Sequence, residues 1–383
     1  MPSKSSPIGL LNWKISEYDP LQSIQEVVQK THWVNLCQRA SDLNHGLPCK
    51  PLSTMTNGLH NLVCILEFSD QTRWVARIGL HKSVKLRNEV DAMQLIKEKC
   101  KFPVPDVFAY EIDDDNPVGV PFILMEFLPG NTAMDAAGGY DVHRGQIPFA
   151  YRPKFYRSVA ECHVQITALR FSKIGTIVRS AEGEYSIGPF PDLGGPFDSA
   201  TSFFEAWAEH IKFPLTTDKI LEMMKGGPAQ RILAAINEFP SKFKAATRQI
   251  SCNNYGPFPL CHADFLHSNI IVDESFQVLG IIDWEGACAL PLQLVTFPGF
   301  LNVMPISFDS PDNYYADGQP VDGQQRQRWK DREDYVQMVE SVEHKDHLLS
   351  RCLTDKKSLA LAYSMMAYKS GKLGFYDTVI DEQ

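Results

Sequence analysis

A short segment of this chain places polar side chains at a spacing that suits acid–base and metal chemistry. His262, Asp264 and Asn269 lie within residues 260–273, among apolar runs. A turn and a further apolar run lead on to Asp283, so the pattern predicts a β-hairpin with these four polar side chains at its open end. An unpaired buried carboxylate is costly, so we expect these groups to serve a ligand.

The oxygen atoms of these side chains suit two tasks of phosphoryl transfer. A carboxylate can accept the proton of a hydroxyl nucleophile, and Asp264 fits this role. Divalent cations that hold nucleotide phosphates prefer hard oxygen ligands, which Asn269 and Asp283 offer. The alternative interpretation is an ordinary polar hairpin without a metal.

The order His-x-Asp-x4-Asn, followed after a hairpin by Ile-Asp-Trp-Glu at 282–285, resembles the catalytic and metal loops of the aminoglycoside phosphotransferase family. Within that family, the chain resembles the broad fungal branch named "phosphotransferase enzyme family". The resemblance implies an α+β, bilobal protein-kinase-like fold with a small β-rich N-lobe and a larger helical C-lobe. It also implies ATP and Mg²⁺ as cofactors and a hydroxyl of a small molecule as the phosphoryl acceptor. His262 would support the catalytic loop. Glu285 would either contact the metal ligands without binding the metal itself or be a surface charge.

The N-terminal part of the chain contains the residues expected to bind the nucleotide. Residues 61–68 and 72–78 form two strand-like runs around a Ser-Asp-Gln turn, which predicts a β-hairpin. The polar loop before it, 54–61, contains Gly58 and Asn61. In the resembling family this loop is the flap over the nucleotide phosphates. A plain turn is the alternative.

Arg77 is the main departure from the kinase pattern. It falls within Trp-Val-Ala-Arg-Ile, where kinases carry Val-Ala-Ile-Lys, and an arginine places its donors differently from an ammonium group. The apolar spacing over 85–99 predicts a helix, and Glu89 on it is the expected partner of Arg77. A solvent-exposed helix glutamate is the alternative for Glu89.

Two further functions stay open, and the arginine motivates the first of them. One is a kinase-fold protein that binds nucleotide or ligand without phosphoryl transfer. The other is non-kinase acid–base chemistry on a biosynthetic intermediate, with Asp264 as general base.

Two more predicted strands, 106–111 and 121–128, end at Pro129-Gly130. The resemblance implies that this is the hinge between the lobes, where the backbone from Glu126 to Leu128 bonds the edge of adenine. The alternative interpretation is a core strand that contacts no ligand.

The expected organisation is a helical N-terminal extension, a nucleotide-binding N-lobe and a C-lobe with the catalytic loop and substrate-binding helices. Their predicted ranges are 1–45, 46–128 and 129–383. Amphipathic helices are predicted over 155–169 and 203–211, the second capped by Asp198 or Ser199, and 216–247 is also predicted to be helical. Residues 302–330 are predicted to form a long polar loop or lid. We expect this loop, with 131–152 and 180–200, to set acceptor specificity.

Composition narrows the range of partners. The 383 residues carry a formal charge of −9, which disfavours nonspecific nucleic-acid binding. Nine scattered cysteines without a Cys-x2-Cys motif suit reduced thiols, and no stretch suggests a secretory signal or a membrane span. We therefore expect a cytoplasmic protein with a small-molecule substrate and no obligate protein partner. The pattern does not fix the oligomeric state.

Overall fold

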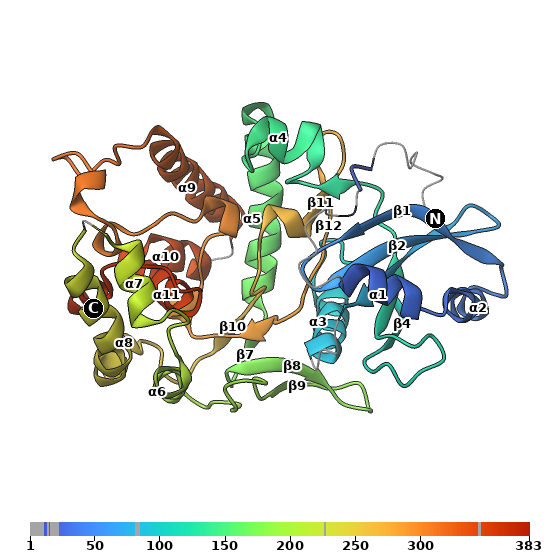
Figure 1. The fold of residues 1–383 in the computed structure, drawn as a ribbon, viewed down its shortest axis with the longest axis horizontal. Coiled ribbons are helices and arrows are strands. Elements are labelled where there is room, and N and C mark those ends of the chain that lie inside the picture. The colour runs from blue at the N-terminus through green and yellow to red at the C-terminus, as the bar shows by residue number, and fades with distance from the viewer. Residues whose placement is uncertain (1–10, 14, 16–22, 81–84, 226, 344–345) are drawn as a thin grey trace. The chain divides into compact units, whose positions relative to one another are not determined.

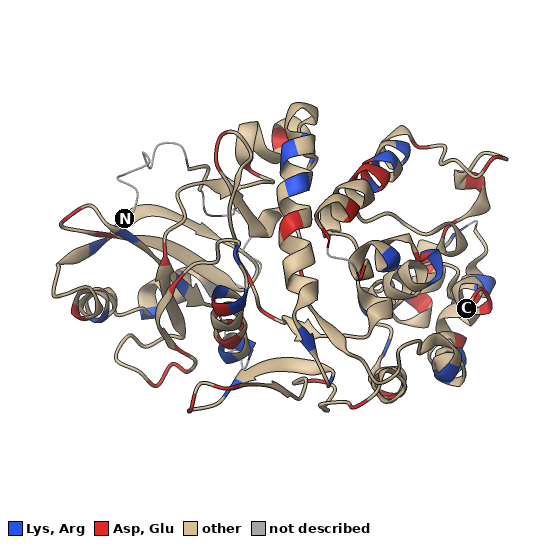
Figure 2. Ribbon diagram, turned by 180° about the vertical axis from the view of Figure 1, so that it is seen from behind, with Lys and Arg blue, Asp and Glu red and all other residues tan. Residues whose placement is uncertain are grey.

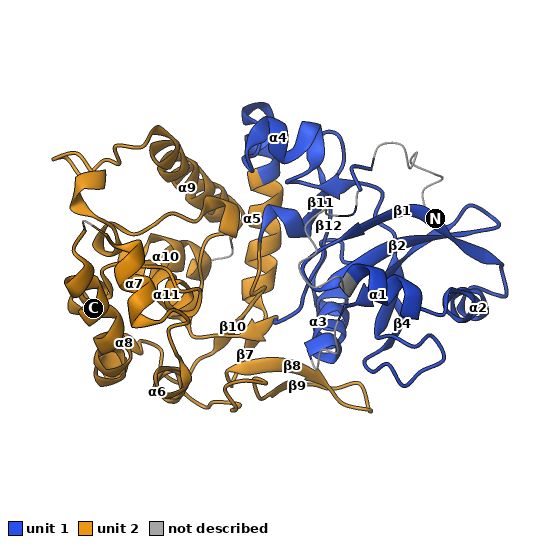
Figure 3. Ribbon diagram, in the orientation of Figure 1, with its two compact units in different colours: residues 1–155, 266–286 blue, residues 156–265, 287–383 orange. Residues whose placement is uncertain are grey.

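The computed structural model describes residues 11–13, 15, 23–80, 85–225, 227–343 and 346–383. The chain divides into two compact units, 1–155 with 266–286 and 156–265 with 287–383 (Figure 3). The α+β fold class is confirmed, because the first unit is built on a β-sheet and the second is mainly helical.

The division into units differs from the predicted domain ranges. The hairpin that precedes Asp283 was expected in the C-lobe, but residues 266–286 belong to the first unit. The predicted boundaries after residues 45 and 128 stay predictions. Part of the N-terminal extension, 1–10, 14 and 16–22, lies outside the described residues.

The first unit contains an antiparallel sheet in the order β1-β2-β3-β5-β4 (Figure 1). Its strands are β1 (Cys49–Asn57), β2 (Asn61–Phe68), β3 (Arg73–Gly79), β4 (Val107–Glu111) and β5 (Phe122–Glu126). The predicted hairpin of β2 and β3 is confirmed, with Val63 opposite Arg77. The predicted flap loop is shorter than expected. Its first residues extend β1 because they pair with β2 as far as Asn57 opposite Leu62, so only 58–60 form the turn.

Both faces of this sheet are covered by helices. The helices are α1 (Ser23–Lys30), α2 (Trp33–Leu43) and α3 (Lys85–Lys99). Trp74, Ala76 and Ile78 of β3 pack in one core with residues of α1 and α2, so the described part of the extension from residue 23 onward is mainly helical and packs on this unit. Val75 packs in a separate cluster with residues of α3. Because successive strand side chains point to opposite faces, Arg77 lies on the α3 face.

The predicted catalytic hairpin forms a small sheet in the order β12-β11-β6. Its strands are β6 (Asn131–Thr132), β11 (Ile270–Val272) and β12 (Val278–Ile281), and the unit also contains α4 (Gly139–His143). The sheet needs glycine at Gly130, where a Cβ would lie 2.2 Å from the carbonyl oxygen of Val272. The hairpin therefore packs closely against the segment that follows β5.

The second unit combines a sheet in the order β7-β10-β13-β8-β9 with several helices. The strands are β7 (Arg170–Phe171), β8 (Gly175–Arg179), β9 (Tyr185–Gly188), β10 (Phe258–Cys261) and β13 (Cys288–Ala289). The helices are α6 (Ala200–His210), α7 (Thr217–Met223), α8 (Ala229–Ile250), α9 (Gly323–Val342), α10 (Leu348–Thr354), α11 (Lys356–Lys369) and α12 (Tyr376–Asp381). Helix α5 (Arg152–Ala168) begins in the first unit and continues in the second.

The core of the second unit is aromatic. Phe204 of α6, Phe239 and Phe243 of α8, Tyr368 of α11 and Tyr376 of α12 are buried together. The start of α6 follows the prediction, because Ser199 is its N-cap and accepts a hydrogen bond from the Ser202 N–H at 3.1 Å.

The predicted loop over 302–330 is wrong over its last residues, 323–330. Helix α9 begins at Gly323, and Asp322 caps it by accepting a hydrogen bond from the Gln325 N–H. Acidic and basic residues are interspersed along α9 (Figure 2), and few of its positions are buried, so the sequence shows no apolar stripe. No helix in the described ranges is long and apolar enough to cross a membrane.

Candidate functional site

Arg77 and Glu89 form a buried ion pair in the first unit. The Arg77 guanidinium donates from Nη2 to Glu89 Oε2, and the two side chains are 11% and 1% exposed. Burial alone would lower the pKa of Arg77, but the neighbouring Glu89 outweighs it and the pKa is raised. Burial raises the pKa of the Glu89 carboxyl, and Arg77 opposes that shift. The structure thus brings the predicted pair together, whereas its role with a nucleotide stays a prediction.

Asp283 follows β12 in an unusual backbone conformation. Its φ is +61°, in the left-handed region, which costs roughly 1–2 kcal/mol for a residue with a Cβ. The turn brings Asp283 Oδ1 to 3.5 Å from Arg77 Nη1. Buried Trp284 anchors the same turn, because its Nε1–H donates to the Ile281 carbonyl at 3.0 Å. Backbone strain held in this way is typical of functional sites.

Three carboxylates meet at this point. Glu89, Asp283 and Glu285 each offer an oxygen, and these oxygens lie within 4.8 Å of one another. One guanidinium faces three acidic groups, so the cluster has an excess of negative charge that a divalent cation would balance. Carboxylate oxygens are the ligands that Mg²⁺ prefers, so the residues fit this ion. We call these three residues the acidic cluster. The sequence left the role of Glu285 open between a support of the metal ligands and a surface charge, and the structure places it in this cluster.

The backbone of Asn269 is hydrogen-bonded to the segment that leads into the acidic cluster. Asn269 is buried, and its carbonyl oxygen accepts a hydrogen bond from the Ile282 N–H at 2.9 Å. The backbone of Asn269 is therefore next to the residue that precedes Asp283. Its assignment as a metal ligand stays a prediction.

Asp264 belongs to the second unit, whereas Arg77, Glu89, Asn269, Asp283 and Glu285 belong to the first. It is exposed and lies in the loop that follows β10. The next residue, Phe265, is held within the second unit by a hydrogen bond from the Gly299 N–H to its carbonyl oxygen at 2.8 Å. The loop therefore leaves the Asp264 carboxylate accessible to solvent.

Aromatic and histidine side chains support this loop from inside the second unit. Buried His262 stacks on Phe265 with ring centroids 5.6 Å apart, and buried His163 meets the same ring edge-on at 5.4 Å. His163 Nδ1 is hydrogen-bonded to the Tyr335 hydroxyl at 3.1 Å. His163 and Tyr335 are distant in sequence, so no local pattern could have linked Tyr335 to the loop.

The environment of His163 makes the stability of the fold depend on pH. Burial, with a smaller contribution from His262, lowers the pKa of His163 to about 3. The unfolded chain therefore binds a proton near pH 6.5 that the folded chain does not bind, and folding stability falls as the pH drops. We expect a loss of up to about 1.4 kcal/mol of unfolding free energy per pH unit below about pH 6.5.

Urea unfolding at a series of pH values tests this expectation. His163→Gln should reduce the slope of the unfolding free energy against pH, because it removes the titrating group. His210→Gln, at an exposed position of the same unit, is the matched control and should keep the slope of the unchanged chain. Equal slopes in all three proteins would contradict the assignment.

The other residues predicted to contact a nucleotide lie at or just beyond the ends of strands in the first unit's sheet. Gly58 is in the turn between β1 and β2, where its N–H donates to the Asn61 carbonyl at 3.0 Å. A Cβ at Gly58 would meet nothing within 4 Å, so the fold itself does not require glycine there. After β5, the Glu126 N–H donates to the Asp106 carbonyl at 2.8 Å, and the Leu128 carbonyl accepts from the Gly130 N–H at 2.9 Å.

Comparison with known proteins places these features in a family. Residues 52–292 match the phosphotransferase enzyme family, APH. The match covers more than half of the chain, and the chain belongs to this family.

Curated relatives and solved structures were also found. "Altered inheritance of mitochondria protein 9, mitochondrial" of Saccharomyces cerevisiae S288c is 22% identical over 335 residues, which cover 71% of this chain and 52% of that protein. The protein of the same name from Candida glabrata is 28% identical over 148 residues, covering 33% of this chain and 23% of its own length. The chain thus spans about half the length, or less, of these relatives.

Among solved structures, the aminoglycoside phosphotransferase APH(4)-Ia in a ternary complex with AMP-PNP and hygromycin B aligns with a TM-score of 0.49 and 14% identity. That alignment covers 91% of this chain and 93% of the other. Macrolide 2'-phosphotransferase type I aligns with a TM-score of 0.43 and 14% identity, covering 91% and 95%.

Proposed function

We propose that the chain is an ATP-dependent phosphotransferase that acts on a hydroxyl group of a small molecule. The observation that carries this proposal is the acidic cluster at the buried Arg77 guanidinium, which is paired with one member of the cluster, Glu89. A fold gains little from packing three carboxylates around one guanidinium, whereas a site for a cation and phosphates requires both kinds of charge. Membership of the phosphotransferase enzyme family supports the same conclusion.

Each charged residue has a distinct role in this proposal. Arg77, held by Glu89, contacts the nucleotide phosphates. Asp283 and Asn269 would hold Mg²⁺, and a carboxylate oxygen of Glu285 lies within 4.8 Å of one of Asp283. Bound Mg²⁺ supplies positive charge against the phosphate oxygens. Asp264 accepts the proton of the acceptor hydroxyl, a role that its exposure to solvent permits.

The backbone supplies the remaining contacts to the nucleotide. The backbone from Glu126 to Leu128 bonds the edge of the base, and because the Leu128 carbonyl oxygen already accepts the Gly130 N–H, Leu128 offers its N–H. The turn at Gly58 has room for a phosphate to approach the backbone, which explains a glycine that the fold does not need.

Arg77 also favours a second candidate function, which is nucleotide or ligand binding without phosphoryl transfer. A guanidinium is planar and can bind Glu89 and a phosphate at the same time, but it does not reproduce the position of a lysine ammonium. A protein of this kind would bind ATP and leave it intact.

Calorimetric titration with ATP tests the nucleotide site. We expect ATP to bind in the presence of Mg²⁺ and to bind at least about ten times more weakly when the cation is removed with EDTA. Asp283→Asn should cause a loss of similar size with Mg²⁺ present. Asp115→Asn, at an exposed position of the first unit, is the control and should bind as the unchanged chain does. Equal affinity with and without the cation would count against the acidic cluster as a metal site.

The relatives carry "mitochondrial" in their names, which does not match the cytoplasmic location expected from the sequence. A cytoplasmic location and a lack of nucleic-acid and obligate protein partners stay predictions.

A further inference from the structure

The second unit contains a polar pocket of about 380 Å³. Its wall is formed by residues 302–304, by the N-terminal end of α9 with Asp322, and by Tyr363 and Lys372. This volume falls in the range of pockets that bind small molecules. All of these residues belong to one compact unit, so the pocket does not depend on the other unit.

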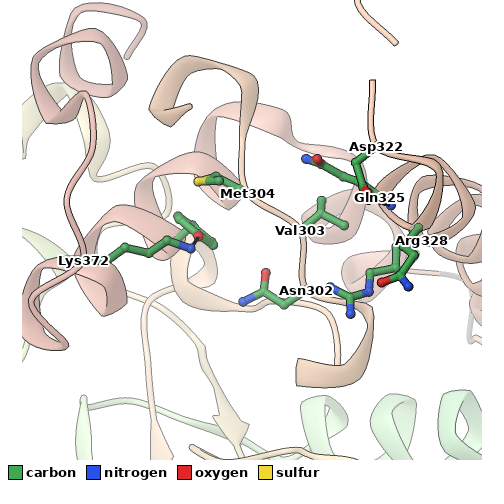
Figure 4. A pocket seen from close by; sticks show the side chains of 9 residues that line it. Asn302, Val303, Met304, Asp322, Gln325, Arg328 and Lys372 are labelled. Carbon is green, nitrogen blue, oxygen red and sulfur yellow. Dashed lines mark hydrogen bonds between the residues drawn. The ribbon is translucent and has the colours of Figure 1, made fainter. Parts of the chain in front are cut away.

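Two cationic side chains define the chemistry of the pocket. Figure 4 shows Arg328 and Lys372 extending toward Asn302 from opposite sides. Within the described part of the chain, neither side chain forms an ion pair with a carboxylate. Lys372 Nζ instead donates to the Tyr363 hydroxyl and lies 5.2 Å from the centre of that ring. Both positive charges are therefore left to interact with a ligand.

The acidic residue of the wall does not neutralise these cations. Asp322 caps α9, and its Oδ1 accepts the Gln325 N–H at 2.7 Å. The carboxylate is thus engaged with the helix end, where it offsets the positive end of the helix dipole. With two cations and one carboxylate, the wall keeps a net positive charge.

The rest of the wall offers hydrogen bonds and a small apolar surface. Asn302, Gln324 and Gln325 supply carboxamides, which can donate to and accept from hydroxyl groups. Val303 and Met304 supply apolar contacts. A ligand that matches this wall has an anionic group, several hydroxyls and a compact carbon skeleton.

We propose that this pocket binds a small polyhydroxylated organic anion, a phosphate monoester or a carboxylate, between Arg328 and Lys372. The pocket residues belong to the second unit and the acidic cluster belongs to the first, and the inference stands without the phosphotransferase proposal. Guanidinium and ammonium groups both bind phosphate and carboxylate oxygens, so the two anions share the same recognition chemistry.

Calorimetry on the full chain without nucleotide tests the proposal, with glucose 6-phosphate, gluconate and glucose as probes. Glucose 6-phosphate carries the phosphate, gluconate carries a carboxylate, and glucose is the neutral match. We expect at least one anion to bind at least about tenfold more tightly than glucose, and the preferred anion identifies the charged group. No anion binding at millimolar concentration, or equal binding of glucose, would overturn the proposal.

Two variants locate the site. Arg328→Gln and Lys372→Gln should each weaken binding of the preferred anion about tenfold, because each removes one charge. Lys369→Gln, at an exposed position at the end of α11 outside the pocket wall, is the matched control and should bind normally. Thermal melting of each variant checks folding. Unchanged affinity in both folded pocket variants would show that the anion binds elsewhere.

Discussion

Asp264→Asn is expected to reduce the rate of phosphoryl transfer about a thousandfold while ATP binding stays unchanged. The carboxamide fills nearly the same space as the carboxylate but cannot accept the proton of the acceptor hydroxyl, and general-base catalysis contributes roughly 10²–10⁴-fold. The side chain is exposed, so the substitution should not disturb the fold. Steady-state rates of phosphorylated product formation, with ATP affinity from calorimetry, measure the two effects separately.

Asp218→Asn provides the matched control for this variant. Asp218 is an exposed aspartate of α7 in the same unit, and its substitution should leave the rate unchanged. A wild-type rate in Asp264→Asn would remove Asp264 from the mechanism. A parallel loss of ATP affinity would show that Asp264 acts in binding instead.

Arg77→Met is expected to lower the free energy of unfolding by about 3–5 kcal/mol at neutral pH without divalent cations. The substitution leaves Glu89, which is 1% exposed, buried beside Asp283 and Glu285 with no positive partner. Mg²⁺ should restore part of this stability, because the ion supplies the missing charge. Urea unfolding with and without Mg²⁺ measures both effects.

Companion variants show whether the loss comes from the unpaired carboxylate. Arg77→Met combined with Glu89→Gln should lose less than the sum of the single changes, because no buried charge remains in that pair. Arg39→Met, at an exposed arginine of α2, controls for the general effect of losing an arginine and should be nearly neutral. Additive losses, or no effect of Mg²⁺ on Arg77→Met, would contradict the proposed electrostatics.

Much of the first unit was predictable because its signals are local. The helix over 85–99 and the hairpin of β2 and β3 follow from apolar spacing within each segment. The prediction that Arg77 pairs with Glu89 also needed the family pattern. The alternation of side chains along a strand predicts only the face of the sheet on which Arg77 lies. The structure places Glu89 on the helix that covers this face.

Other features depend on tertiary structure that local patterns do not encode. Glu285 meets Glu89 just after Asp283, which has a positive φ, and the sequence does not reveal that turn. Tyr335 of α9 contacts His163, which is far away in the sequence. The start of α9 at Gly323 was not predicted, because the first residues of this helix are polar. The pocket with Arg328 and Lys372 likewise joins segments that are far apart in sequence.

Isotope tracing of the terminal phosphate of ATP is the most direct test of the proposed chemistry. The chain is incubated with Mg²⁺, γ-labelled ATP and a mixture of hydroxylated metabolites, and the products are separated by mass spectrometry. Phosphoryl transfer predicts the label in a phosphate ester of one metabolite, with ADP formed in equal amount and both products lost in Asp264→Asn. ATP that binds but remains intact across the whole mixture, or label found only in inorganic phosphate, would contradict it.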